Sequence, residues 1–153
     1  MIDRRTFLLL SLFATGARAQ LPPNIQEIRK KAFDEAIRKV VGNAEVRPGK
    51  VKLDLPPLID NGNAVPVTIE VESPMTAQDH VKSIHLFTER NPQPYVISAH
   101  LGPRSGRARI ATRARIADTG LVTAIAQMSD GSFWSDSAKV IVTLSACLEE
   151  GLI

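Results

Sequence analysis

The stretch AVPVTIEVES (residues 64–73) decides the fold of this 153-residue chain. Every second residue from Val65 to Val71 is a β-branched aliphatic residue, and the residues between them vary. This period of two is typical of a strand with one face against a core. Pro66 lies inside the stretch and cannot donate a ladder hydrogen bond, so we expect an edge position or a bulge there.

The same alternation recurs on both sides of this stretch. Turn-forming sequences separate the segments, among them PPLIDNGN (residues 56–63), and Asp130-Gly131 is a hairpin signal. Seven short strands with no helices between them predict an all-β domain, an immunoglobulin-like antiparallel β-sandwich. Besides 64–73, the expected strands are residues 50–55, 81–89, 94–101, 106–117, 119–129 and 138–144.

One helix is expected before the sandwich, over residues 24–42. Apolar residues recur there at intervals of three and four, which predicts an amphipathic helix. Asn24 with Glu27 predicts a capping box at its start, and Gly42 is placed to end it. The expected apolar stripe is Ile25, Ile28, Ala32, Phe33, Ala36, Ile37, Val40 and Val41.

The first nineteen residues have the features of an export signal. A basic start with Arg4 and Arg5 precedes a short apolar run, and small residues precede a cleavage point after Ala19. The arginine pair favours the twin-arginine type over an ordinary signal. We therefore expect a signal peptide over 1–19, a domain over 20–144 and a periplasmic location.

Charge and hydropathy limit the partners of the exported chain. The formal net charge is +3 for the whole sequence and falls to +1 without the signal, which carries +2. This small charge and the export signal predict no nucleic-acid partner. No second long apolar run follows, so we expect no membrane insertion of the mature chain.

Cys147 is the one cysteine, and it lies in the last nine residues, 145–153. An unpaired cysteine in an exported protein indicates a reactive thiol or an intermolecular disulfide. Glu149 and Glu150 disfavour the thiolate, so the residue is interpreted as a covalent attachment point served by other proteins. The alternative is a structural cysteine that completes the last strand.

Other candidate residues point to no catalytic centre. His80, His85 and His100 have no acidic cluster beside them in the sequence, and with a single cysteine no cysteine-rich metal site can form. No Ser-His-Asp arrangement or glycine-rich phosphate loop is present. We therefore expect no enzyme activity, no metal and no cofactor.

Two further features could contact partners. Alternating arginines share one strand face, which is either a solvated outer face or an anion-binding row. Phe133 and Trp134 follow the hairpin turn, so one should enter the core while the other points outward as an anchor. The arginines are Arg107, Arg109, Arg113 and Arg115.

Five long stretches cover nearly the whole chain after the signal. They are FDEAIRKVVG (33–42), KVKLDLPPLIDNGNAVPVTIEVESPMT (50–76), IHLFTERNPQP (84–94), SGRARIATRARIADT (105–119) and VTAIAQMSDGSFW (122–134). Together they resemble SoxY, the sulfur carrier of the bacterial sulfur-oxidising system.

The resemblance implies an exported immunoglobulin-like carrier that forms a heterodimer with a SoxZ-like protein. It also implies a flexible C-terminal arm whose cysteine, here Cys147, receives thiosulfate from a c-type cytochrome enzyme. Hydrolase enzymes then process the bound sulfur, and the carrier itself catalyses nothing.

The arm departs from the family pattern GGCGG. Residues 145–153 read SACLEEGLI, which is closer to SoxY relatives with an AACIE-like arm. Leu148 and the glutamates make the arm wider and more acidic. The resemblance therefore supports the carrier architecture more strongly than it supports thiosulfate as the cargo. The alternative function is a non-catalytic periplasmic interaction module whose cysteine is structural or forms an intermolecular disulfide.

Overall fold

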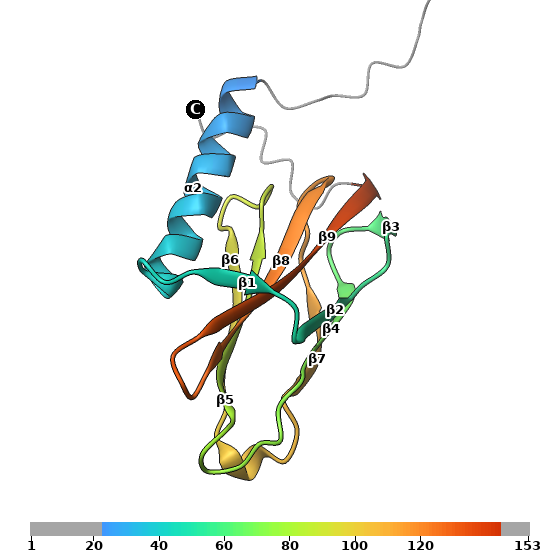
Figure 1. Cartoon of the computed structure of the whole chain (residues 1–153). Helices are drawn as coiled ribbons and strands as arrows, with labels where there is room; N and C mark the ends of the chain where they lie inside the picture. Colours follow the sequence, from blue (N-terminus) through green and yellow to red (C-terminus); the bar gives the residue numbers. More distant parts are fainter. Residues whose placement is uncertain (1–22, 145–153) are drawn as a thin grey trace, which may run out of the picture.

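The computed structural model describes residues 23–144, which form one helix against a two-layered β-sandwich (Figure 1). The helix is α2 (Pro23–Val41), and a single 3-10 turn, η2 (Pro103–Ser105), precedes β7. The strands are β1 (Val46–Pro48), β2 (Val51–Asp54), β3 (Leu58–Asn61), β4 (Val65–Val71), β5 (Val81–Thr88), β6 (Tyr95–His100), β7 (Arg109–Ala114), β8 (Gly120–Met128) and β9 (Phe133–Leu144).

Two sheets make the sandwich. The larger has the order β1-β9-β8-β5-β6, with β3 paired to β9 as well, and the smaller has the order β2-β4-β7. The hairpin predicted at Asp130-Gly131 joins β8 to β9, with Gln127 opposite Phe133. The expected all-β sandwich with one N-terminal helix is confirmed.

Two strands were not predicted from the sequence. β1 and β3 both pair with β9 in parallel, whereas every other pair in the described chain is antiparallel. β3 arises from PPLIDNGN, which was interpreted as a turn. β9 also begins at Phe133, earlier than the expected start at residue 138.

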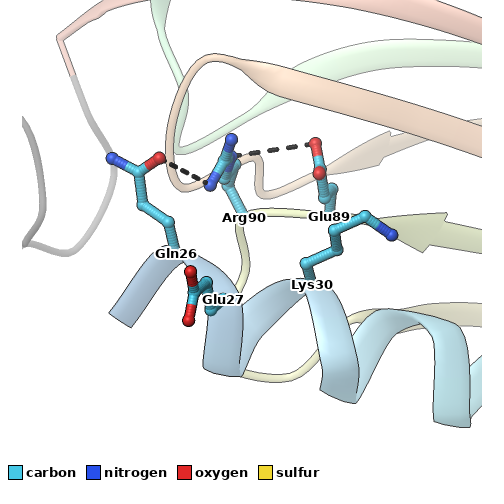
Figure 2. A pocket seen from close by; sticks show the side chains of 5 residues that line it. All are labelled: Gln26, Glu27, Lys30, Glu89 and Arg90. Carbon is cyan, nitrogen blue, oxygen red and sulfur yellow. Dashed lines mark hydrogen bonds and ion pairs between the residues drawn. The ribbon is translucent and has the colours of Figure 1, made fainter. Parts of the chain in front are cut away.

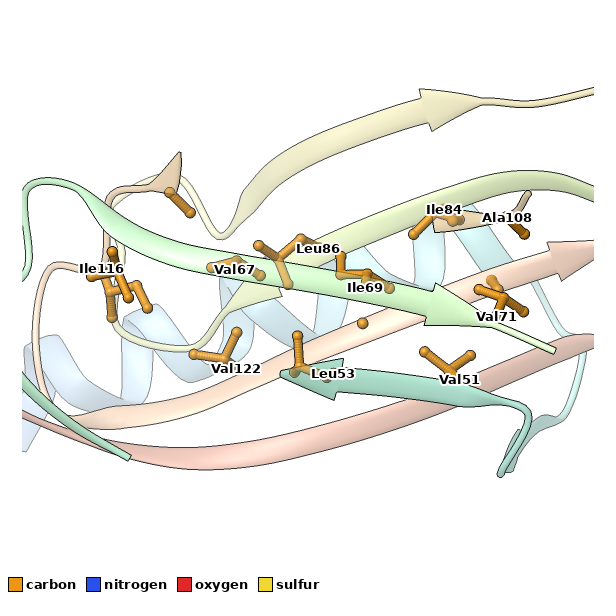
Figure 3. Packing of buried hydrophobic residues seen from close by; sticks show 14 of the residues in the cluster. Val51, Leu53, Val67, Ile69, Val71, Ile84, Leu86, Ala108, Ile116 and Val122 are labelled. Carbon is orange, nitrogen blue, oxygen red and sulfur yellow. The ribbon is translucent and has the colours of Figure 1, made fainter. Parts of the chain in front are cut away.

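The core lies between the two sheets, and the alternating residues of β4 are its centre. Val67 and Ile69 are buried, and they converge with Leu86 of β5 and Leu53 of β2 (Figure 3). The alternation predicted for residues 64–73 therefore separates the inner from the outer face of β4.

Pro66 shows how β4 tolerates a proline. β4 is the middle strand of its sheet, so the edge position expected at Pro66 does not extend to the strand as a whole. The β2 pairing, however, ends with Asp54 opposite Thr68, and Pro66 pairs only with Arg113 of β7. Its missing N–H therefore costs no bond to β2.

The helix covers part of the outer face of the large sheet. Phe33 of α2 packs on Phe87, Ile125 and Phe133, which point away from the sandwich interior and form a second apolar cluster. Because α2 covers this outer face, both faces of β5 are buried around Phe87. None of the described helices is long and apolar enough to span a membrane.

The ends and faces of α2 differ in part from the prediction. Gly42 ends the helix with φ 62°, and its N–H donates to the Arg38 carbonyl. Asn24 lies inside the helix rather than ahead of it. Ile28 is 64% exposed, so it is not part of the buried stripe. Phe33 and Ile37 belong to that stripe and pack in the second apolar cluster.

Candidate functional site

The base of the C-terminal segment is the part of the predicted carrier site that the structure describes. Cys147 and residues 145–153 lie outside the described residues. Strand β9 ends at Leu144, three positions before the cysteine. The end of β9 is therefore the last described point of the chain before the segment that bears the thiol.

The end of β9 is held by β3 rather than by β8. The β8 pairing runs only to Gly120, opposite Val140, and from there β3 pairs with β9 in parallel. Figure 1 shows β3 beside the last part of β9. The register places Leu58 beside Ile141 and carries the pairing to Leu144. The strand is thus paired up to the point where the predicted arm begins.

Two threonine side chains add hydrogen bonds at this end. The Thr143 hydroxyl lies 3.3 Å from the Ile59 carbonyl oxygen and 3.2 Å from that of Asp60, so it can donate to either. The Val142 N–H donates to the Thr119 hydroxyl at 2.9 Å. These bonds tie the end of β9 to β3 on one side and to Thr119, just before β8, on the other.

Apolar side chains are exposed at the same place. Leu58 is 58% exposed and Ile141 is 50% exposed, and they are neighbours on β3 and β9. The next residues, Ile59 and Val142, are buried in the core. We call Leu58 and Ile141 the root patch.

His85 is the centre of a hydrogen-bonded group on the outer face of the large sheet. His85 is buried, with Nδ1 2.6 Å from the Tyr95 hydroxyl and Nε2 2.8 Å from the Ser83 hydroxyl. His100 lies edge-on to His85, with ring centroids 6.4 Å apart. Both His85 nitrogens are therefore engaged, and His80 lies elsewhere, bonded to the Thr76 carbonyl.

Within residues 23–144, no group of three or more His, Cys, Asp or Glu side chains is placed to hold a metal ion. His85 and His100 lie on neighbouring strands and do come together. The hydroxyl groups of Tyr95 and Ser83, however, lie within hydrogen-bond distance of both ring nitrogens of His85. The arrangement is a structural hydrogen-bond network.

Burial, and secondly the charge of His100, lower the pKa of His85 below its usual value of about 6.5. The unfolded chain then binds a proton more readily, so we expect full stability above about pH 6.5 and a loss as pH falls below it. Urea unfolding at several pH values, for the wild type and His85→Gln, measures this. An equal loss below pH 6.5 in both proteins would assign the effect to another group.

The arginine row faces solvent. Arg109 and Arg113 lie on β7, the edge strand of the small sheet, and Arg107 and Arg115 flank it, all exposed. Charged side chains on an edge strand discourage pairing with other chains.

Phe133 and Trp134 are both packed, which corrects the expectation of one outward anchor. Phe133 is buried under α2. Trp134 packs against the inner core, and its ring lies 4.8 Å from the Lys50 ammonium and 5.9 Å from the Arg47 guanidinium. Its indole N–H donates to the Ser132 hydroxyl. The ring is therefore fixed within the domain and does not project as an anchor for a partner.

The family model described as "Sulfur oxidation protein SoxY" matches residues 37–147, which is more than half of the chain. The chain belongs to the SoxY family. The matched region runs from the second half of α2 through the sandwich and ends on Cys147. A comparison with curated protein sequences found no match.

Solved structures agree with this assignment. The sulfur carrier protein SoxY from Chlorobium limicola f thiosulfatophilum is 26% identical, with a TM-score of 0.62, over 74% of this chain and 98% of that one. A superoxide reductase (neelaredoxin) variant from Ignicoccus hospitalis is 17% identical, with a TM-score of 0.55, over 71% and 86%. The second likeness shows the fold alone, whereas the first joins fold and family in a carrier protein.

One pocket of this SoxY-family chain was not predicted from the sequence. It has a volume of about 270 Å³ and lies between the start of α2 and the end of β5 (Figure 2). Arg90 is central, 3.7 Å from the Glu89 carboxylate and 3.4 Å from the Gln26 side-chain oxygen. Two cations and two carboxylates balance in its lining, which is Gln26, Glu27, Lys30, Glu89 and Arg90. No charge excess selects an ionic ligand there.

Proposed function

We propose that this SoxY-family protein carries a sulfur-containing group covalently on Cys147 and presents it to enzymes of sulfur oxidation in the periplasm. The observation that carries the proposal is the family match, which includes the cysteine as its last residue. The likeness to a solved sulfur carrier over 98% of that protein's length supports the same function.

The position of Cys147 suits a carrier. It follows the braced end of β9 by three residues, so a fixed domain precedes a short segment with a thiol. A thiolate is the nucleophile in sulfur chemistry, and an ordinary thiol has a pKa of about 8.5. A small fraction is therefore ionised near neutral pH without any help from the chain.

Loading with thiosulfate requires an oxidation. The Cys147 sulfur bonds to the outer sulfur of thiosulfate, the thiol proton leaves, and a c-type cytochrome accepts two electrons. A hydrolase then adds water across the bond between the outer sulfur and the sulfonate, which releases sulfate and two protons and leaves a deprotonated persulfide on the cysteine. All chemistry is supplied by partner enzymes, so the chain is a carrier and not a catalyst.

Export and partnership are parts of the same proposal. Residues 1–19 would direct the chain to the periplasm, by the twin-arginine route that suits an already folded protein. A SoxZ-like protein would be the second subunit of a heterodimer, and a second copy of this chain is the other candidate. Intact-mass measurement of the complex purified from the host shows whether it contains one kind of chain or two.

The sequence around Cys147 bears on the cargo. Leu148 and Glu149 stand where the GGCGG arm has glycines, as in the AACIE-like relatives, and Glu150 follows them. Carboxylates two and three positions from the thiol repel anions, so a less highly charged relative of thiosulfate is a better cargo than thiosulfate itself. The proposal therefore specifies a thiosulfate-derived or related sulfur group.

Intact-mass measurement tests the function. The full chain is purified without reductant from its host grown on a reduced sulfur compound. We expect a mass increase equal to one sulfur-containing group, located on Cys147 and removed by reductant. A protein that carries no adduct and forms only a reducible disulfide with another chain would favour the interaction module instead.

A further inference from the structure

The number of residues between β9 and Cys147 limits how far the thiol can reach. Three residue steps separate Leu144 from Cys147. A fully extended chain spans at most about 3.6 Å per residue, so the two Cα atoms lie within roughly 11 Å of each other. An enzyme that acts on this thiol must therefore bring its reaction centre within that distance of the end of β9.

Contact between such an enzyme and the sandwich follows from this limit. An active site is surrounded by protein, and ligand pockets enclose most of the surface of what they bind. A rim that surrounds the bound cysteine would meet the surface at the end of β9. This surface contains the root patch, since Ile141 precedes Leu144 by three residues and Leu58 is its neighbour on β3.

The composition of this surface indicates what kind of rim would fit. Leu58 and Ile141 are two of the four large apolar side chains that are strongly exposed within residues 23–144. Asp60 and Lys139 lie on the same outer face, two positions from the patch, and their opposite charges cancel. Recognition here would rest on apolar contact and not on net charge.

We propose that the root patch is the docking surface for the enzymes that load and unload Cys147. The fitting partner has an apolar rim around a thiol-accepting pocket no deeper than about 11 Å. This inference rests on the proposed carrier function, and it adds where on the sandwich the partner binds.

The variant Leu58→Thr/Ile141→Thr tests the docking surface. Threonine keeps the strand preference and removes apolar area, and both sites are exposed, so thermal stability should stay near that of the wild type. After a pulse of the reduced sulfur compound on which the host grows, we expect the initial rate of adduct formation on Cys147 to fall at least about tenfold, as for residues at the centre of an interface. The single variant Leu58→Thr provides the same test should the double variant fold poorly.

Two controls separate docking from other effects. Ile28→Thr removes an equally exposed apolar side chain from α2 and should load at the wild-type rate. A Gly/Ser insert of about six residues after Leu144 adds roughly 20 Å of reach. In the double variant the insert should restore part of the loading, because the enzyme no longer needs to touch the patch.

The outcomes are distinct. If the wild type carries no adduct, the carrier function and the docking surface both fail. If the double variant loads as fast as Ile28→Thr, the docking surface alone is wrong. If iodoacetamide alkylates Cys147 faster in the double variant than in the wild type, the patch is covered by residues 145–153 themselves, and the enzyme-docking proposal is overturned.

Discussion

Replacement of Cys147 by serine should abolish the carrier function completely. A serine hydroxyl forms no bond to sulfur under these conditions, because only a thiolate attacks and is later released in sulfur exchange. We expect no adduct on the intact protein and no growth that depends on the reduced sulfur compound. Intact mass and growth rate of a chromosomal Cys147→Ser strain measure both.

The matched control is Ser145→Ala, which changes the same segment and keeps the thiol. It should load and support growth like the wild type. The thermal unfolding of both variants should be unchanged, since residues 145–153 follow the last strand. Wild-type growth of the Cys147→Ser strain, with its partner still bound, would instead support an interaction module.

Replacement of Phe87 by alanine should cost about 3–5 kcal/mol of unfolding free energy. Phe87 has no exposed surface and joins α2 to the large sheet. Its ring packs edge-on against Phe33 with centroids 6.5 Å apart and stacks on Tyr95 at 4.9 Å. The variant would leave a cavity on the face of the sheet that the helix covers. Urea unfolding at pH 7.5 measures the loss.

Ile28→Ala is the control for this prediction. Its side chain is 64% exposed on the same helix, so its removal should change the unfolding free energy by no more than about 0.5 kcal/mol. A loss below about 1 kcal/mol for Phe87→Ala would show that the helix contributes little to the stability of the domain.

The inner faces of the central strands could be predicted because their core residues recur at an interval of two. In β4 the residues from Val65 to Val71 alternate between core and surface, and the sequence repeats that period. β5 also alternates on its inner face, with Ile84 and Leu86 in the core. Local pattern and tertiary position agree in these strands.

The strand segments that could not be predicted from the sequence are those stabilised by residues far away in the sequence. β3 lies within a turn-rich stretch, and it is a strand because β9 pairs with it. The first part of β9 carries polar residues on both faces, and Asp136 there accepts a hydrogen bond from the Leu53 N–H. Neither arrangement leaves a period of two in the sequence.

The sequence by itself determined the class of the domain, the single thiol and the family of the chain. Periodicity and residue order are local properties, so they can be read from one chain. The root patch was decided only by the tertiary structure, because Leu58 and Ile141 are remote in sequence and meet through parallel pairing of β3 with β9. The packing of Trp134 and the exposure of Ile28 were decided in the same way, since both depend on which surface the neighbouring elements cover.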